Sequence, residues 1–279
     1  MTAEVFAPAK VNLALHVTGQ RADGYHLLDS LVVFAGFGDT ISVSPSDPLT
    51  LTITGPEGHA LTPGEDNLVL RAARSFGTGH GAAITLTKRL PIASGIGGGS
   101  ADAAATLKAL ARHWDQPFPP ADVVTALGAD VPVCLAAHPA RMSGIGDVIG
   151  RVPDLPDGIA LLLVNPRVAV STPAVFRALP RKDNPPLSSL PARFGTAQAL
   201  ATWLSAQRND LEALARALEP VIGDVLTAIA GTDSLHTRMS GSGATCFGLF
   251  PNIGLAEAAA AAISTSRPDW WVQAAPMLR

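Results

Sequence analysis

A glycine-rich segment in the first half of the chain constrains the fold most strongly. Residues 88–105 read KRLPIASGIGGGSADAAA and contain four closely spaced glycines, Gly95, Gly97, Gly98 and Gly99. Glycine loses more backbone entropy on folding than any other residue, so such a run needs a structural reason. The sequence predicts a strand over Ala82–Lys88 before the segment and a helix over Ala101–Trp114 after it, with Ser100 as the N-cap.

This position between a strand and a helix indicates a phosphate-binding loop. Glycine lets the backbone approach an anion closely, and a helix N-terminus adds free N–H groups and a favourable dipole. The helix is supported by an apolar stripe at helical spacing, formed by Ala104, Leu107, Ala111 and Trp114. Asp102 would suit the helix dipole but would oppose a phosphate if it pointed into the loop. The alternative is a flexible surface loop, which the short length and regular flanks disfavour, so the segment predicts a nucleotide-using enzyme.

The familiar nucleotide-binding motifs do not match this segment. A P-loop requires a Gly-Lys dipeptide, which the chain lacks. A dinucleotide-binding fingerprint needs glycine where Ser100 stands and a loop that follows its strand directly, whereas residues 89–91 intervene. The His-Arg-Asp and Asp-Phe-Gly motifs of protein kinases are also absent. The expected phosphate loop therefore belongs to a different class of fold.

Composition restricts the partners of the chain. The 279 residues are 47% hydrophobic with a net charge of −3, which predicts a globular protein that binds neither nucleic acid nor a membrane surface. No apolar run approaches the roughly 20 residues of a spanning helix, and the N-terminus lacks the pattern of a signal peptide, so we expect a cytoplasmic protein. Cys134 and Cys246 lie in apolar segments and are expected to be buried hydrophobes rather than a disulfide. The seven histidines are scattered singly, without metal-site spacing.

The order of elements predicts an α+β fold in two lobes. A proline- and glycine-rich passage at residues 151–158 is the best candidate boundary, which gives lobes of residues 1–152 and 153–279. Residues 180–191 are expected to form an exposed loop. The expected strands are 4–6, 11–18, 28–34, 40–44, 49–54, 82–88, 159–164, 245–250 and 271–273. The expected helices are 67–76, 101–114, 121–127, 197–218, 220–230 and 255–264.

Three further segments carry chemistry-bearing residues. Lys10 and Asn12 are two positions apart in a predicted strand and therefore lie on the same face of it. This face is either exposed to solvent or part of a site. Residues 23–26, Asp-Gly-Tyr-His, place Tyr25, the single tyrosine, beside His26 in what is otherwise an ordinary packed turn. Residues 238–244, Arg-Met-Ser-Gly-Ser-Gly-Ala, form either a simple hairpin or a second nest of N–H groups.

Together these segments resemble the GHMP kinase family, the small-molecule kinases named for galactose, homoserine, mevalonate and phosphomevalonate. The family pattern consists of Pro-x-Lys, a central glycine-rich loop and Ser-Gly-x-Gly, and it is matched at residues 8–10, 91–101 and 240–243. Ile96 replaces the usual leucine and Ala101 the second serine, which puts any role of position 101 in phosphate or metal contact in doubt. The resemblance implies a two-lobed fold, with an N-terminal nucleotide-binding lobe like that of a ribosomal protein and a ferredoxin-like C-terminal lobe.

Within the family, Asp-Gly-Tyr-His and Gly-Ala-Asp-Val-Pro (residues 128–132) are similar to a branch that phosphorylates an alcohol carried on a cytidine diphosphate, on the non-mevalonate route to isoprenoid precursors. The resemblance implies Asp130 as the base and Lys10 as its partner. It implies Mg²⁺ and ATP as cofactors, with Ser100 as a metal ligand. The ATP-binding residues would be Pro91, Ile92, Ala93, Ser94, Gly95, Ile96, Gly97, Gly98, Gly99, Ser100 and Ala101.

The same resemblance assigns the cytidyl substrate to four residues. Tyr25 and Phe176 would stack on the cytosine ring, His26 would hydrogen-bond its edge, and Asn12 would contact the erythritol. A core phenylalanine at a helix start is the alternative for Phe176, and a turn residue beside Gly128 is the alternative for Asp130. We expect a monomer or weak homodimer. The competing functions are another GHMP kinase, acting on mevalonate, homoserine or a sugar, and a non-catalytic protein of the same fold.

Overall fold

The computed structural model describes residues 3–77 and 79–279, and the chain divides into two compact units. Unit 1 comprises Met1–Ala9, Gly38–Ile92 and Gly97–Ala137, and unit 2 comprises Lys10–Phe37, Ala93–Ile96 and His138–Arg279. This division differs from the single boundary predicted after residue 152. The reason is that two long strands, β1 (Ala3–Gln20) and β2 (His26–Ser44), each continue from one unit into the other.

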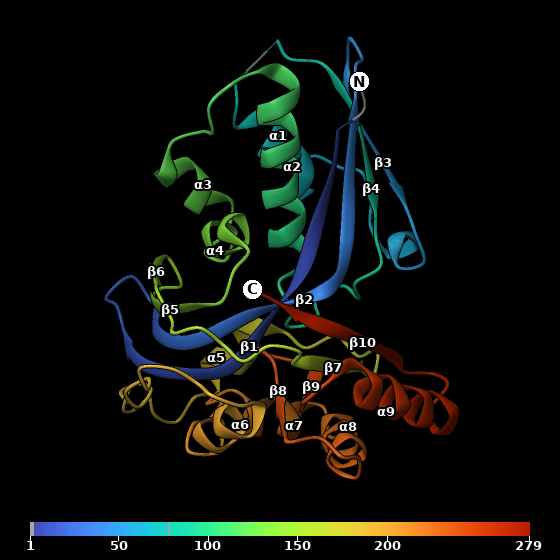
Figure 1. The fold of residues 1–279 in the computed structure, drawn as a ribbon. Helices are drawn as coiled ribbons and strands as arrows, with labels where there is room; N and C mark the ends of the chain where they lie inside the picture. Colours follow the sequence, from blue (N-terminus) through green and yellow to red (C-terminus); the bar gives the residue numbers. More distant parts are fainter. Residues whose placement is uncertain (1–2, 78) are drawn as a thin grey trace. The chain divides into compact units, whose positions relative to one another are not determined.

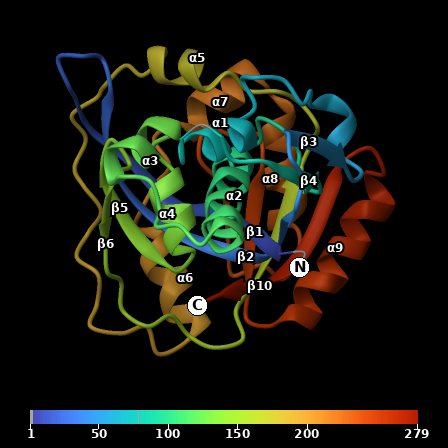
Figure 2. The ribbon, with the colours of Figure 1, turned by 90° about the horizontal axis from the view of Figure 1, so that it is seen from above.

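In unit 1, helices pack beside a short stretch of sheet (Figure 1). Strand β4 (Ala82–Thr87) pairs antiparallel with the last residues of β2 and parallel with β3 (Leu49–Thr54). Its side chains alternate between buried and half-buried, as expected for a strand with one covered face. Helix α2 (Gly98–Trp114) packs against α1 (Leu68–Arg74) and α4 (Val131–Ala136) (Figure 2). The remaining elements are the short 3₁₀ helix η1 (Gly58–Ala60) and α3 (Ala121–Leu127).

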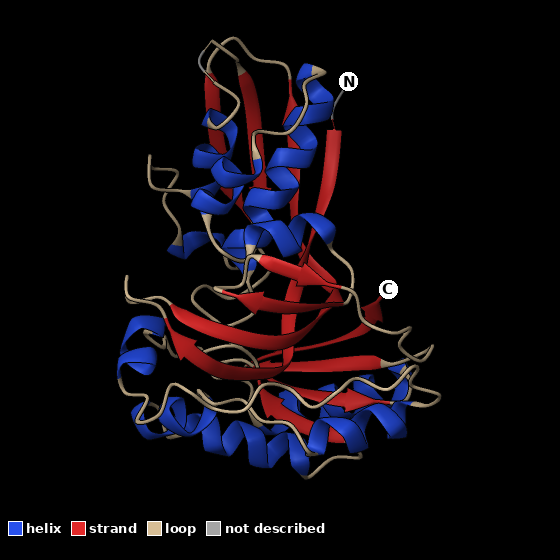
Figure 3. Cartoon of the chain, turned by 90° about the vertical axis from the view of Figure 1, so that its left-hand side faces the viewer, coloured by secondary structure: helices blue, strands red, loops and turns tan. Residues whose placement is uncertain are grey.

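In unit 2, an antiparallel sheet is built around β7 (Ala160–Asn165), in which every residue is buried. It runs in the order β2, β10 (Trp271–Leu278), β7, β9 (Cys246–Phe250) and β8 (His236–Met239). Helices α8 (Val221–Ala230) and α9 (Ile253–Ser266) cover one face of this sheet (Figure 3). The other elements are β5 (Ala140–Gly144), β6 (Val148–Gly150), α5 (Thr172–Arg177), α6 (Ala197–Ser205) and α7 (Glu212–Leu218).

Mixed helices and strands confirm the predicted α+β class, with several corrections. Two pairs of expected strands are single strands, β1 and β2. The helix expected over 197–218 is wrong, because residues 206–211 leave the helix and form backbone hydrogen bonds with β1 at Leu15. Six elements lie outside the expected strands and helices: η1, α4, α5, β5, β6 and β8. Cys134 and Cys246 are free and buried, as expected. Within the described residues, no helix has the length and apolar character needed to cross a membrane.

Candidate active site

The glycine-rich segment passes from unit 1 into unit 2 and back. In unit 1 it leads into α2, which begins at Gly98 after Gly97, whose φ of 65° is left-handed. The predicted N-cap at Ser100 is therefore wrong, since Ser100 lies inside the first turn. The first backbone bond of the helix runs from Ala101 N to Gly97 O, so the N–H groups of residues 98–100 have no helical acceptor. This geometry is that of an anion site at a helix N-terminus.

A buried cluster of charges lies beneath this helix start. The Lys88 ammonium donates to Asp39 Oδ2 at 2.6 Å and to Asp102 Oδ2 at 2.7 Å, and all three side chains are almost completely buried. An ideal Cβ on Gly98 would lie 3.1 Å from Lys88 Nζ, so glycine at this position also makes room for the ammonium. Burial by itself would lower the pKa of Lys88, but Asp102 and Asp39 outweigh it and raise that pKa. Asp102 thus points into the protein, and not toward a phosphate in the loop.

In unit 2 the segment is tied to the turn that joins β8 to β9. Ser94 O accepts from Thr245 N at 3.1 Å, and Gly95 O accepts from Ser240 Oγ at 2.9 Å. Gly95 has a φ of 76°, and an ideal Cβ there would lie 2.4 Å from Ser240 O. A side chain at this position is excluded both by the backbone conformation and by space. Lys10 N donates to Ile96 O at 3.0 Å, so the first and the third family motifs both contact the central glycine-rich motif.

Asn12 lies next to this turn, and one polar atom of its side chain lacks a hydrogen-bond partner among the described residues. Its backbone N–H donates to Ser240 Oγ at 3.0 Å, and its Nδ2 donates to Ser30 Oγ at 2.8 Å. Its Oδ1 is buried and has no hydrogen-bond partner among the described residues. An orphaned acceptor in a buried position is costly, so a ligand that supplies a donor would be favoured there.

The aromatic residues of unit 2 form a second part of the candidate site. The rings of His26 and Phe176 lie 4.7 Å apart between centroids, at an interplanar angle of 32°. His26 Nε2 is buried without a partner among the described residues. Burial, followed by the positive charge of Lys182, lowers the pKa of His26, so the ring is neutral near pH 7 and offers one donor and one acceptor. Tyr25, the preceding residue, is 60% exposed and so available for stacking.

The predicted catalytic residues lie in different units. Lys10 is buried on β1 in unit 2. Asp130 directly precedes α4 in unit 1, where its carbonyl accepts from Cys134 N at 3.1 Å. Unit 1 also holds Pro91, Ile92 and the residues from Gly97 to Ala101. Unit 2 holds Ala93, Ser94, Gly95, Ile96 and all four predicted substrate-binding residues, Asn12, Tyr25, His26 and Phe176.

Sequence reasoning missed Asn209, which supports this site from outside the three motifs, and gave no role of its own to Arg238, the first residue of the segment 238–244. Asn209 Nδ2 donates to both Met239 O and Gly241 O at 2.8 Å, which fixes the β8–β9 turn. The guanidinium of Arg238 binds the carbonyls of Leu13, Leu204 and Gln207. Nothing in the local sequence around Asn209 marks it, because all these partners are distant in the chain.

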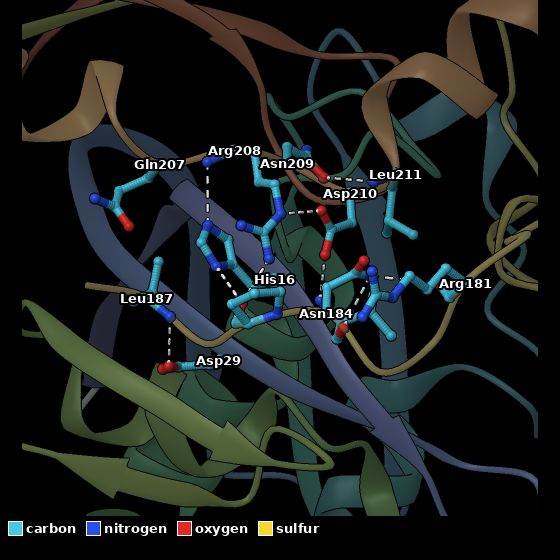
Figure 4. A network of polar contacts seen from close by, with 12 residues as sticks. His16, Asp29, Arg181, Asn184, Leu187, Gln207, Arg208, Asn209, Asp210 and Leu211 are labelled. Atoms are coloured by element: carbon cyan, nitrogen blue, oxygen red, sulfur yellow. Dashed lines mark hydrogen bonds and ion pairs between the residues drawn. The ribbon is translucent and has the colours of Figure 1, made fainter.

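Residues 180–191 are expected to form an exposed loop, but several of them form hydrogen bonds with β1 and β2 (Figure 4). His16 Nε2 accepts from Arg208 N at 3.1 Å, so its Nδ1 carries the hydrogen and donates to Pro185 O at 3.1 Å. Asn184 N donates to Val17 O, and Leu187 N donates to Asp29 Oδ2 at 2.9 Å. Leu187 is buried, which corrects the expectation for this part of the loop.

Comparison with known proteins agrees with the three motifs. Residues 67–149 match the sequence model of the GHMP kinases N terminal domain, and residues 189–268 match that of the GHMP kinases C terminal. The chain belongs to the GHMP kinases and is a small-molecule kinase, which confirms the predicted family and fold.

Similarity to individual proteins is more specific. A Ruegeria pomeroyi protein named 4-diphosphocytidyl-2-C-methyl-D-erythritol kinase is 58% identical over 273 residues, which cover 97% of this chain and 98% of that protein. A Paramagnetospirillum magneticum protein of the same name is 54% identical over 283 residues, covering 98% of this chain and 97% of that one. The crystal structure of a 4-(cytidine 5'-diphospho)-2C-methyl-D-erythritol kinase is similar with a TM-score of 0.77 and 32% identity, covering 98% of this chain and 99% of that one.

Proposed function

We propose that this chain transfers the γ-phosphoryl group of ATP to the 2-hydroxyl of 4-diphosphocytidyl-2-C-methyl-D-erythritol, in the cytoplasm and as a monomer or weak homodimer. The observation that carries the substrate assignment is the set of unsatisfied polar groups in unit 2. His26 Nε2 and Asn12 Oδ1 are both buried without partners among the described residues, and His26 lies against the ring of Phe176. A cytosine ring requires aromatic faces and a polar edge, and a polyol supplies hydroxyl donors.

The proposed chemistry needs a proton acceptor and compensation of charge. The acceptor hydroxyl oxygen forms a bond to the γ-phosphorus, the bond from that phosphorus to the ADP oxygen breaks, and the hydroxyl proton passes to the Asp130 carboxylate. Lys10 supplies a positive charge that offsets the charge on the transferring group. The relatives named as this kinase, at 54–58% identity, support the assignment.

The nucleotide phosphates are assigned to the glycine-rich segment. The support is the free N–H groups at the start of α2 and the absence of a Cβ at Gly95, Gly97, Gly98 and Gly99. Mg²⁺ prefers hard oxygen ligands and keeps several waters, so the Ser100 hydroxyl in the first turn of α2 fits it together with phosphate oxygens. When bound, Mg²⁺ would neutralise phosphate charge.

A matched pair of variants tests the role of Asp130. Asp130→Asn should nearly abolish turnover while the affinity for ATP stays within a few-fold, because the amide keeps the shape but accepts no proton. Asp122→Asn, in the exposed first turn of α3, removes the same charge and should leave turnover unchanged. Turnover by Asp130→Asn at the rate of Asp122→Asn would remove Asp130 from the mechanism.

A further inference from the structure

The orientation of the Asn12 side chain is fixed by a residue outside the three motifs. Asn12 is buried on β1, and Ser30, which is 1% exposed, faces it from β2. The Asn12 amide lies 2.8 Å from Ser30 Oγ, while its other end, Oδ1, has no partner among the described residues. Which end of the amide faces Ser30 decides whether Asn12 offers a ligand an acceptor or a donor.

The chemistry of the Ser30 hydroxyl settles this choice. Its oxygen lies 2.6 Å from Ala14 O. A carbonyl oxygen carries no hydrogen, so the single hydroxyl hydrogen of Ser30 is used in this contact. Ser30 Oγ therefore has only lone pairs left for Asn12, and the Asn12 atom that faces it has to be the donor Nδ2. The flipped amide would bring two acceptors together, so Oδ1 is the atom left for a ligand.

A second serine holds the backbone of Asn12 by the same pattern. Ser240 Oγ accepts from Asn12 N at 3.0 Å and donates to Gly95 O at 2.9 Å. Each of the two buried serines thus accepts one hydrogen bond from Asn12 and passes its own hydrogen to a backbone carbonyl. Neither the main chain nor the side chain of Asn12 is free to rotate without losing a buried hydrogen bond.

We propose that Ser30 is a positioning residue that makes Asn12 an obligate hydrogen-bond acceptor for a hydroxyl of the alcohol substrate. The inference rests on the proposed function and adds a determinant of its selectivity. A hydroxyl can donate to Oδ1, whereas a group that only accepts, such as a fluorine or an ether oxygen, cannot. Because Oδ1 has no partner to give up, the donor gains a full hydrogen bond in buried surroundings. Ser30 thereby selects a free hydroxyl over a group that only accepts.

The test compares Ser30→Ala with Ser30→Thr and with a control on the same strand, Ser42→Ala. The substrates are the cytidyl-erythritol and analogues in which each non-reacting hydroxyl of the erythritol is replaced by fluorine, which accepts a hydrogen bond weakly but cannot donate one. Wild type should discriminate most strongly against one analogue, about tenfold in kcat/KM for one buried hydrogen bond. In Ser30→Ala the amide is free to flip, so this ratio should fall toward one and KM for the full substrate should rise, with KM for ATP unchanged. Ser30→Thr keeps the hydroxyl and should restore the ratio.

Coupling to Asn12 separates positioning from a general loss of structure. In an Asn12→Ala background, Ser30→Ala should have no further effect on the KM of the acceptor. If Ser30→Ala does not fold, Ser30→Cys keeps the size with a much weaker acceptor and should lower the discrimination in part. Unchanged discrimination in Ser30→Ala, or in Ser30→Cys where Ser30→Ala does not fold, would overturn the inference alone, as would an equal loss in Ser42→Ala. Failure of wild type to phosphorylate the cytidyl substrate would overturn the proposed function, and this inference with it.

Discussion

Removal of the Lys88 ammonium should destabilise the chain far more than removal of an exposed cation. Lys88→Met removes the ammonium that both Asp39 and Asp102 bind, at 0% and 4% side-chain exposure. Burial already raises the pKa of Asp102 to about 7, so this side chain becomes neutral in the variant and Asp39 keeps the buried negative charge. Loss of one partner from a buried ion pair costs about 3–5 kcal/mol, because the remaining charge stays buried and uncompensated. Typical domains are stable by about 5–15 kcal/mol, so the variant should still fold at low temperature.

The structure offers a matched control for this change. Arg74 forms an ion pair with Glu65, but the two side chains are 49% and 73% exposed. Exposed pairs contribute about 0–1 kcal/mol, so Arg74→Met should alter the free energy of unfolding very little. Both substitutions remove one positive charge from unit 1 and introduce the same side chain.

Urea denaturation followed by far-ultraviolet circular dichroism measures both free energies of unfolding. Asp102→Asn gives a third point, because Lys88 keeps Asp39 at 2.6 Å and the amide oxygen can still accept from the ammonium. Its cost should therefore fall between the other two. A Lys88→Met variant within about 1 kcal/mol of Arg74→Met would refute the view that this cluster supports the start of α2.

Three further predictions concern the glycine loop, the proposed cytosine-binding site and the pH dependence of stability. Gly95→Ala should lose activity and at least about 1–2 kcal/mol of stability, because Gly95 has a positive φ and a Cβ there would clash with Ser240 O. Gly195→Ala is the control, since a Cβ there meets open space, and it should be nearly neutral in the same assays. Tyr25→Ala should raise KM for the cytidyl substrate about tenfold through lost stacking, and an equal rise in KM for ATP would argue against that role. Burial, followed by the positive charge of Arg238, lowers the pKa of His236 to about 4 in the folded protein. In the unfolded chain this pKa is about 6.5, so between pH 6.5 and 4 the unfolded state binds a proton at His236 that the folded state does not bind. The free energy of unfolding should then fall between pH 6.5 and 4, by about 3 kcal/mol from this residue. In His236→Leu the free energy of unfolding measured in urea should depend less on pH over that range. An unchanged pH dependence in this variant would contradict the role given to His236.

The glycine loop was predictable because its signal is local. Four glycines between a strand and a helix specify a tight backbone path whatever surrounds them, and Gly95 and Gly97 do have positive φ. The break in the helix expected over 197–218 was not predictable, because Arg208 and Asp210 instead form backbone hydrogen bonds with Leu15, almost 200 positions away. Tertiary pairing of this kind overrides local helix propensity.

The supporting residues of the site were hidden for a related reason. Ser30 and Asn209 are ordinary polar residues in sequence, and their importance arises from buried partners contributed by other segments. The sequence predicts separate strands over 4–6 and 11–18, on either side of Pro8, yet β1 continues through Pro8 into unit 2. Motifs therefore identified the residues expected to touch ligands, while the residues that orient them required the structure.

The most direct test of the central claim is a coupled assay of ADP release with Mg-ATP and four acceptors in parallel. The account predicts turnover with 4-diphosphocytidyl-2-C-methyl-D-erythritol and none with mevalonate, homoserine or galactose. Turnover with one of the other alcohols and not with the cytidyl compound would contradict the substrate assignment, and with it the roles proposed for Tyr25, His26 and Asn12.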